Sequence, residues 1–178
     1  MIMIKIKSTK ERQLTETEVK HLHQIMVKGY ELTEEEIWGK NYVRLFLPDF
    51  EKLVNEGQIY VAYLDDKIVG CVQIYQRDDN TFGFSLLAVD FNYAHQGIGT
   101  ALINKAEEIA LANGAKQMRI EILRVKDEDV PHKVILANYY KRLGYEYTHS
   151  EDCACLIPAW KYKLLVKPSN FDFYVKNL

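Results

Sequence analysis

Residues 85–114, SLLAVDFNYAHQGIGTALINKAEEIALANG, place two glycines at the start of a helical pattern. Glycine costs about 1 kcal/mol relative to alanine inside a helix, so Gly97 and Gly99 need a reason. The first N–H groups of a helix have no carbonyl partners, and the helix dipole adds positive charge there. Together with the Thr100 hydroxyl, the glycines predict a phosphate site. Close packing of the helix on a sheet is the alternative explanation.

Two other glycine-loop folds fit this segment less well. A dinucleotide-binding motif puts its first glycine directly after a strand and a small residue three positions after the second glycine. Here the strand is expected to end near Asp90, and the third position is Leu102. Glu121 does lie where a ribose-binding acid would, so an oxidoreductase is kept as the weakest class of function. A P-loop is excluded because no Gly-Lys-Ser/Thr follows.

The composition is that of an ordinary globular protein. The 178 residues have a net charge of −2 and are 48% hydrophobic, without the basic excess that nucleic-acid binding requires. No apolar run is long enough to span a membrane, and the N-terminal MIMIKIKSTKERQ predicts a strand and not a signal peptide. The three cysteines lack zinc spacing, so we expect a reduced, cytoplasmic protein without a metal site.

The elements that would position the glycine loop follow from periodicity and turn residues. Capping-box spacing predicts one helix start at Thr15–Glu18 and another at Thr33–Glu36, and apolar stripes predict helices at residues 97–113, before Gly114, and 132–144. Strands are expected where β-type apolar segments lie between turn residues. These strands are residues 2–7, 58–64, 67–77, 81–90, 117–125, 145–149 and 159–167.

This order of elements predicts an α/β protein of the α+β type. The strands in residues 58–90 would pair as an antiparallel meander, and the helix at residues 97–113 would make one parallel crossover. We expect a mixed, mostly antiparallel twisted sheet of about six to seven strands with helices on both faces. Residues 1–178 are expected to form a single domain, with residues 168–178 as a C-terminal tail.

Two segments resemble signatures of the GNAT superfamily of N-acetyltransferases. LLAVDFNYAHQGIGTALINKAEEIA is similar to the family's acyl-CoA-binding motif, in which a strand is followed by a Gln/Arg-x-x-Gly-x-Gly/Ala loop and a helix. YYKRLGY, residues 139–145, is similar to a second signature, in which a tyrosine precedes a polar pair, Leu-Gly and an aromatic residue. The resemblance implies a GNAT-like fold and an acyl-CoA-dependent N-acetyltransferase.

The resemblance also implies how acetyl-CoA would bind. Loop amides would hold the pyrophosphate, and the strand backbone around Leu87 and Val89 would pair with the pantetheine amides. The loop residues are His95, Gln96, Gly97, Ile98, Gly99 and Thr100. The sequence departs from the family pattern at Ala94, where the family has Gln or Arg, and at Lys133, where the family often has Asn. Lys133 is interpreted either as a solvated helix residue or as a ligand of a CoA phosphate.

By the same resemblance, Tyr140 would be the general acid that protonates the departing CoA thiolate. A phenol pKa of about 10 against a thiol pKa of about 8.5 makes this transfer depend mainly on positioning. Tyr139 is the residue that a one-residue alignment shift would select. Glu121 is the candidate general base for the substrate amine, with an ordinary polar strand residue as the alternative. No metal is expected in this chemistry.

The expected acceptor is a primary amine of a small molecule or a protein. Glu31 and Glu34–Glu36 could attract a cationic amine, or the second capping box could explain them. An acyl-CoA-binding regulatory module without turnover is the alternative function, because Ala94 and Lys133 replace two family residues. No nucleic-acid or membrane partner is expected. The aromatic tail could pack on its own domain or cover a second subunit, so a homodimer stays open.

Overall fold

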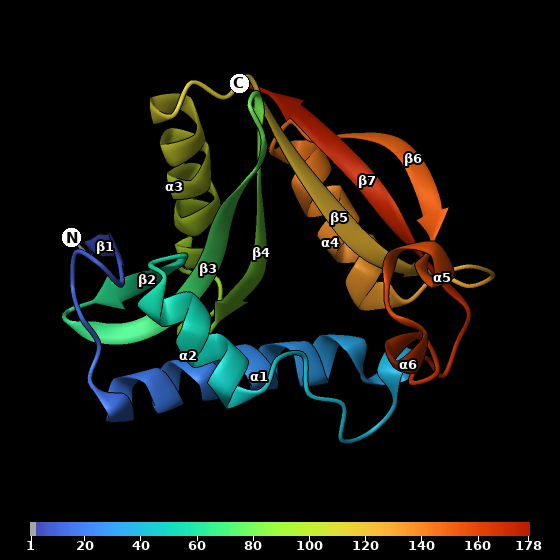
Figure 1. Cartoon of the computed structure of the whole chain (residues 1–178), viewed down its shortest axis with the longest axis horizontal. Helices are drawn as coiled ribbons and strands as arrows, with labels where there is room; N and C mark the ends of the chain where they lie inside the picture. The colour runs from blue at the N-terminus through green and yellow to red at the C-terminus, as the bar shows by residue number, and fades with distance from the viewer. Residues whose placement is uncertain (1–2) are drawn as a thin grey trace.

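The computed structural model describes residues 3–178, and seven strands in this range form one mixed sheet (Figure 1). The strand order is β1-β2-β3-β4-β5-β7-β6, and β4–β5 is the parallel pair among antiparallel neighbours. The strands are β1 (Ile4–Ser8), β2 (Ile59–Leu64), β3 (Lys67–Asp78), β4 (Thr81–Val89), β5 (Gln117–Val125), β6 (Glu146–Asp152) and β7 (Ser169–Asn177). The expected mixed, mostly antiparallel sheet is confirmed.

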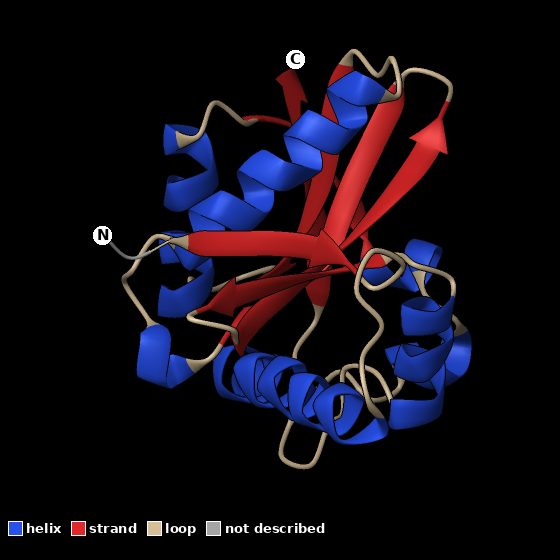
Figure 2. Cartoon of the chain, turned by 90° about the vertical axis from the view of Figure 1, so that its left-hand side faces the viewer, coloured by secondary structure: helices blue, strands red, loops and turns tan. Residues whose placement is uncertain are grey.

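Helices cover both faces of this sheet (Figure 2). One apolar core lies between the sheet and α3 and α4, and a second lies between the sheet and α1 and α2. The helices are α1 (Glu16–Trp38), α2 (Leu47–Asn55), α3 (Ile98–Ala112) and α4 (Pro131–Arg142), with short turns η1 (Phe91–Tyr93), α5 (Cys153–Leu156) and α6 (Ala159–Tyr162). Within residues 3–178, no helix is both long and apolar enough to cross a membrane.

The first of the two predicted capping boxes is confirmed and the second is wrong. Thr15 caps α1 with both hydrogen bonds of a capping box to Glu18. Thr33 instead lies inside α1, where its hydroxyl donates to the Gly29 carbonyl one turn earlier at 2.9 Å. The helix continues because Ile37 and Trp38 in its last turn are buried. The next helix begins only at Leu47.

The strands β4 and β5 touch at one end and then separate. They pair only where Thr81 and Phe82 face Gln117 and Met118. Beyond this point the sheet opens into the V that Figure 1 shows, with α1 across the open side. The edge of β4 that faces β5 is therefore unpaired from residue 83 to residue 89, while its other edge pairs with β3.

The strand predicted at residues 159–167 is wrong. Residues 159–162 form the helical turn α6, and the last strand is β7. This strand contains most of the segment expected as a tail, and it lies inside the sheet between β5 and β6. Asp172 on this strand is buried, and it accepts hydrogen bonds from Arg124 Nε and Ser150 Oγ, both at 2.6 Å.

Candidate active site

The predicted phosphate site is an exposed turn at the start of α3. Gly97 is the N-cap residue with a left-handed φ of +79°, and His95 has a φ of +61°. A Cβ atom on Gly97 would meet no atom within 4 Å. Close packing on the sheet therefore does not explain this glycine. The left-handed backbone conformation explains it, because glycine adopts this conformation without strain. The N–H groups of the next three residues, Ile98, Gly99 and Thr100, have no carbonyl partner within the helix.

The start of α3 meets α4 where β4 ends. The Thr100 and Tyr139 hydroxyl oxygens lie 2.7 Å apart in a hydrogen bond. A Cβ atom on Gly99 would lie 3.8 Å from the Tyr139 hydroxyl and 4.0 Å from Val89 Cγ2. Both are ordinary contacts, so Gly99 also has room for a side chain. These contacts place the helix start directly beside the unpaired edge of β4.

The other residues predicted to bind the cofactor differ in what they expose. His95 and Gln96 are exposed, as is Ala94 at the position of the missing family side chain. The Ile98 side chain is buried in the core, so only its backbone faces outward. Leu87 is half-buried on β4 and lines the cavity described next.

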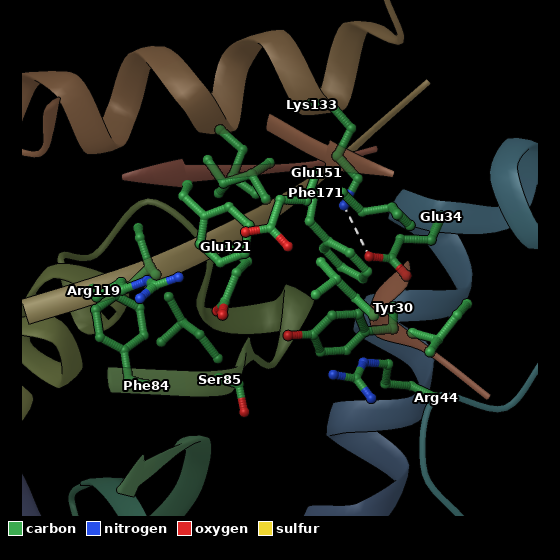
Figure 3. Close-up of a pocket in the computed structure, with 18 of the residues that line it drawn as sticks. Tyr30, Glu34, Arg44, Phe84, Ser85, Arg119, Glu121, Lys133, Glu151 and Phe171 are labelled. Carbon is green, nitrogen blue, oxygen red and sulfur yellow. Dashed lines mark hydrogen bonds and ion pairs between the residues drawn. The ribbon is translucent and has the colours of Figure 1, made fainter. Parts of the chain in front are cut away.

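A cavity of about 470 Å³ occupies the opening between β4 and β5 (Figure 3). This volume lies within the range of small-molecule sites in proteins. The walls come from α1, the α1–α2 connection, all strands from β3 to β7, α4, and the segment containing α5 and α6. Many of the lining residues are aromatic: Tyr30, Trp38, Tyr42, Tyr75, Phe84, Tyr140, Phe171 and Phe173.

Tyr140 and Tyr139 have different surroundings, although they are neighbours in sequence. Tyr140 lines the cavity and is 5% exposed, with its ring packed near Phe84 and Tyr145. Burial raises the pKa of Tyr140 far above that of a free phenol, because it disfavours the phenolate. Tyr140 therefore stays protonated across the neutral and mildly alkaline range. Tyr139 uses its hydroxyl in the hydrogen bond to Thr100.

Glu121 points into the cavity from β5, as Figure 3 shows. Its carboxylate forms an ion pair with Arg77 Nη2 on β3. The same nitrogen of Arg77 donates to the Tyr75 hydroxyl at 2.9 Å. The polar face of β5 that contains Glu121 therefore faces the cavity and not bulk solvent. The carboxylate is within the site, but it already has a cationic partner.

Lys133 is buried, so its interpretation as a solvated helix residue is wrong, and a role as a ligand of a CoA phosphate stays a prediction. Its Nζ atom donates to Glu34 Oε1 at 2.8 Å, and both side chains are less than a tenth exposed. Glu34 also accepts a hydrogen bond from Trp38 Nε1 at 3.0 Å. This pair joins α4 to α1 across the cavity wall. Glu34 thus has a structural partner, while Glu31, Glu35 and Glu36 are exposed.

Sequence reasoning missed several charged residues of the cavity. They are Arg44, Arg77, Arg119, Glu151 and Lys161. They lie on five different segments, and none of them belongs to a motif. No local signal in the sequence could have brought them together. Across residues 3–178, no three His, Cys, Asp or Glu side chains come close enough together to bind a metal ion.

A family model described as the acetyltransferase (GNAT) domain matches residues 55–147. This match covers more than half of the chain, from the end of α2 to the start of β6. The chain belongs to the GNAT acetyltransferase family. Its two sequence signatures, the anion site and the segment containing Tyr140, both lie inside the matched region. The resemblance seen in the sequence is therefore confirmed, and the protein is an acetyltransferase of this family.

Solved structures of other GNAT proteins share the fold. The PaiA N-acetyltransferase of Thermoplasma acidophilum, solved with coenzyme A, has a TM-score of 0.69 and 19% identity, with 99% of both chains covered. An aminoglycoside 6′-N-acetyltransferase complexed with coenzyme A has a TM-score of 0.68 and 15% sequence identity, with 97% of this chain and 96% of the other covered. A GNAT acetyltransferase from Elizabethkingia anophelis with acetyl-CoA bound has a TM-score of 0.61 and 15% sequence identity, with 98% of both chains covered. No curated protein matches the sequence.

Proposed function

We propose that this GNAT protein transfers the acetyl group of acetyl-CoA to a primary amine of a small molecule or a protein, by direct attack in a ternary complex. The observation that supports this most is the arrangement around β4. The open turn at Gly97 lies at the end of β4, one edge of β4 is unpaired, and the buried Tyr140 packs near Phe84 on the same strand. These are the parts needed to bind an anion, hold an extended chain and donate a proton.

The residues present fit acetyl-CoA as the donor. The pyrophosphate would accept hydrogen bonds from the N–H groups of Ile98, Gly99 and Thr100, at the positive end of α3. The unpaired backbone around Leu87 and Val89 would bind the pantetheine amides as an added strand would. Ala94 removes one side chain from this loop and no backbone group. Two of the structurally similar GNAT proteins were solved with coenzyme A and one with acetyl-CoA.

Tyr140 would act at the sulfur end of the reaction. Bound acetyl-CoA supplies a thioester whose carbonyl carbon is attacked by the lone pair of a neutral amine. As the carbon–sulfur bond breaks, Tyr140 would donate its phenolic proton to the thiolate and recover a proton from solvent. Burial keeps the phenol protonated before transfer but also makes it a weaker acid, so the transfer depends on how Tyr140 is positioned beside the sulfur.

Glu121 would act at the amine end. A substrate ammonium has a pKa of about 10.4 and must lose a proton before it can attack. Glu121 would accept this proton directly or through a water molecule. Its Oε2 atom is held in an ion pair with Arg77, so the amine or water must reach the other carboxylate oxygen. We therefore propose Glu121 as a base of modest effect.

The first test is a calorimetric titration of the purified protein with acetyl-CoA, with NAD and ATP as controls. We expect micromolar binding of acetyl-CoA and no comparable binding of NAD or ATP. A protein that binds neither acetyl-CoA nor coenzyme A would contradict the proposal. A screen of amines with detection of the released thiol then measures turnover. Tight acetyl-CoA binding without thiol release for any amine would favour the regulatory module instead.

A further inference from the structure

The cavity has more cationic than anionic side chains. The cations are Arg44, Arg77, Arg119, Lys133 and Lys161, and the carboxylates are Glu34, Glu121 and Glu151. Glu34 and Glu121 form ion pairs with Lys133 and Arg77, and Glu151 is hydrogen-bonded to His149 Nε2. Within the described residues 3–178, Arg44, Arg119 and Lys161 form no such pair, so the cavity has unpaired positive charge.

Two of these unpaired cations gather beside the C-terminal end of α1. Arg44 lies under the Tyr30 ring, with Cζ 5.5 Å from the ring centroid, as Figure 3 shows. Lys161 Nζ lies 5.7 Å from the centroid of Trp38, which stacks on Tyr42 at 4.4 Å. Burial lowers the pKa of Lys161, and the charge of Arg44 lowers it further. The two cations therefore repel each other in the absence of an anion.

The Tyr42 hydroxyl is the third member of this group. Its oxygen is buried and has no hydrogen-bond partner in residues 3–178. Buried hydroxyls in folded proteins nearly always have a partner, because an unpaired one costs free energy. Burial raises the pKa of Tyr42 to about 12, so the hydroxyl stays a donor at neutral pH. The nearby carboxylate of Glu34 is already bound by Lys133 and Trp38, so the two cations and the unpaired hydroxyl have no anion hydrogen-bonded to them.

We propose that Arg44, Lys161 and Tyr42 bind a carboxylate of the acceptor, so that the acceptor is a small molecule carrying both an amine and a carboxylate. This inference rests on the proposed transfer to an amine. A guanidinium binds a carboxylate through two parallel hydrogen bonds, and an ammonium and a hydroxyl can each add another. The carboxylate would lie against α1 while the amine faces Tyr140 and Glu121 on the opposite wall. An acceptor with only positive charge would be repelled at this end.

Matched ligand pairs test the inference by binding. The protein saturated with coenzyme A is titrated with L-phenylalanine and phenethylamine, L-leucine and 3-methylbutylamine, and L-lysine and cadaverine. Each pair differs by one carboxylate. In at least one pair the amino acid should bind about tenfold or more tightly than its amine, as expected for hydrogen bonds to a charged group. If no pair favours the carboxylate, the inference is overturned.

Variants then test which residues cause the preference for the carboxylate. Arg44→Gln and Lys161→Gln should each reduce the preference for the carboxylate about tenfold, because each removes a charge-assisted hydrogen bond. Arg12→Gln is the matched control, since Arg12 also lies over a tyrosine ring, at 4.6 Å from Tyr63, but outside the cavity. A preference that survives both cavity variants would overturn the assignment.

Tyr42→Phe gives a signature that a structural role would not produce. Removing a buried hydroxyl without a partner should leave the melting temperature of the free protein unchanged or higher. The same change should weaken binding of the amino acid and leave binding of its amine unaltered. A lower melting temperature with unaltered binding would contradict the role of Tyr42.

These measurements separate the inference from the function on which it rests. Binding of the ligand pairs does not require turnover. A carboxylate preference that depends on Arg44, without thiol release from acetyl-CoA, would support the binding site and contradict the acetyl transfer. Efficient acetylation of the amines with no preference for the amino acids would support the acetyl transfer and contradict the carboxylate site.

Discussion

The proposed anion site at residues 95–100 consists of the backbone of one continuous segment, whereas the cavity is lined by side chains from segments far apart in the chain. The first depends on the left-handed conformation at Gly97 and on free N–H groups. The second depends on pairs such as Lys133 and Glu34, which are 99 residues apart. A backbone site tolerates many side-chain changes but not a change of conformation or charge. A side-chain site tolerates neither loss of a partner nor a change of packing.

The largest effect is expected from a charge placed in the anion site. Gly97→Glu should abolish measurable binding of acetyl-CoA, because a carboxylate would face the pyrophosphate. Gly114→Glu is the matched control, since Gly114 also has a φ of +79° and open space around its Cβ position. Calorimetric titration of both variants separates charge from backbone strain. Equal losses of affinity in the two variants would contradict the anion site.

Tyr140→Phe should lower turnover by about 10²- to 10⁴-fold with little change in acetyl-CoA affinity, because it removes the proton donor and keeps the packed ring. Tyr139→Phe should have a smaller effect on turnover, since that hydroxyl bonds Thr100. Because burial raises the pKa of Tyr140, its ionisation should cause no loss of wild-type turnover up to about pH 10. Steady-state kinetics with thiol detection measure the turnover of both variants and the pH dependence of the wild type. Unchanged turnover in Tyr140→Phe would remove this tyrosine from the mechanism.

The cavity wall should be sensitive to loss of one charge. Lys133→Met leaves Glu34 buried without its cation and should lower the free energy of unfolding by about 3–5 kcal/mol. The double variant Lys133→Met with Glu34→Gln should recover part of this loss, since the introduced amide keeps an acceptor for Trp38 Nε1. Urea unfolding of both variants measures the difference. An equally large loss in the exposed pair control Lys20→Met would show that burial is not the cause.

The smallest effect is expected at Glu121. Glu121→Gln should lower turnover by about 10²-fold at most, the lower end for a general base, because Arg77 already stabilises its charge. Glu151→Gln is the control, as Glu151 is a second carboxylate in the same cavity. If Glu151→Gln alone lowered turnover, the assignment of the base would move to β6.

The sequence predicted the elements whose signals are local. The capping box at Thr15, the hairpin turn at Asp65 and Asp66 with positive φ, and the glycine after α3 all follow from neighbouring residues. The false start at Thr33 has the same local pattern as a true one, and only the buried last turn of α1 overrides it. The strand β7 was not expected inside the sheet because Asp is depleted in strands, and the partners that allow Asp172 to be buried, Arg124 and Ser150, are remote in sequence.

The candidate site divides in the same way. The anion site and the tyrosine pair could be predicted, because a short motif specifies each. The charge balance of the cavity could not be predicted, since Arg44, Glu151 and Lys161 come from unrelated segments and belong to no motif. Lys133 was misjudged for the same reason. A lysine on an amphipathic helix is usually solvated, and only the folded chain brings Glu34 beside it.

The position of β7 between β5 and β6 has a consequence for folding of the nascent chain. On the ribosome, β5 and β6 emerge before the strand that pairs with both of them, so each has an open edge until residues 169–177 are made. The half of the sheet that contains β2, β3 and β4 can form hairpins during synthesis, because its strands are neighbours in sequence. The β5-β7-β6 side of the cavity can therefore be completed only after β7 is made, and its open strand edges are exposed to wrong pairing until then.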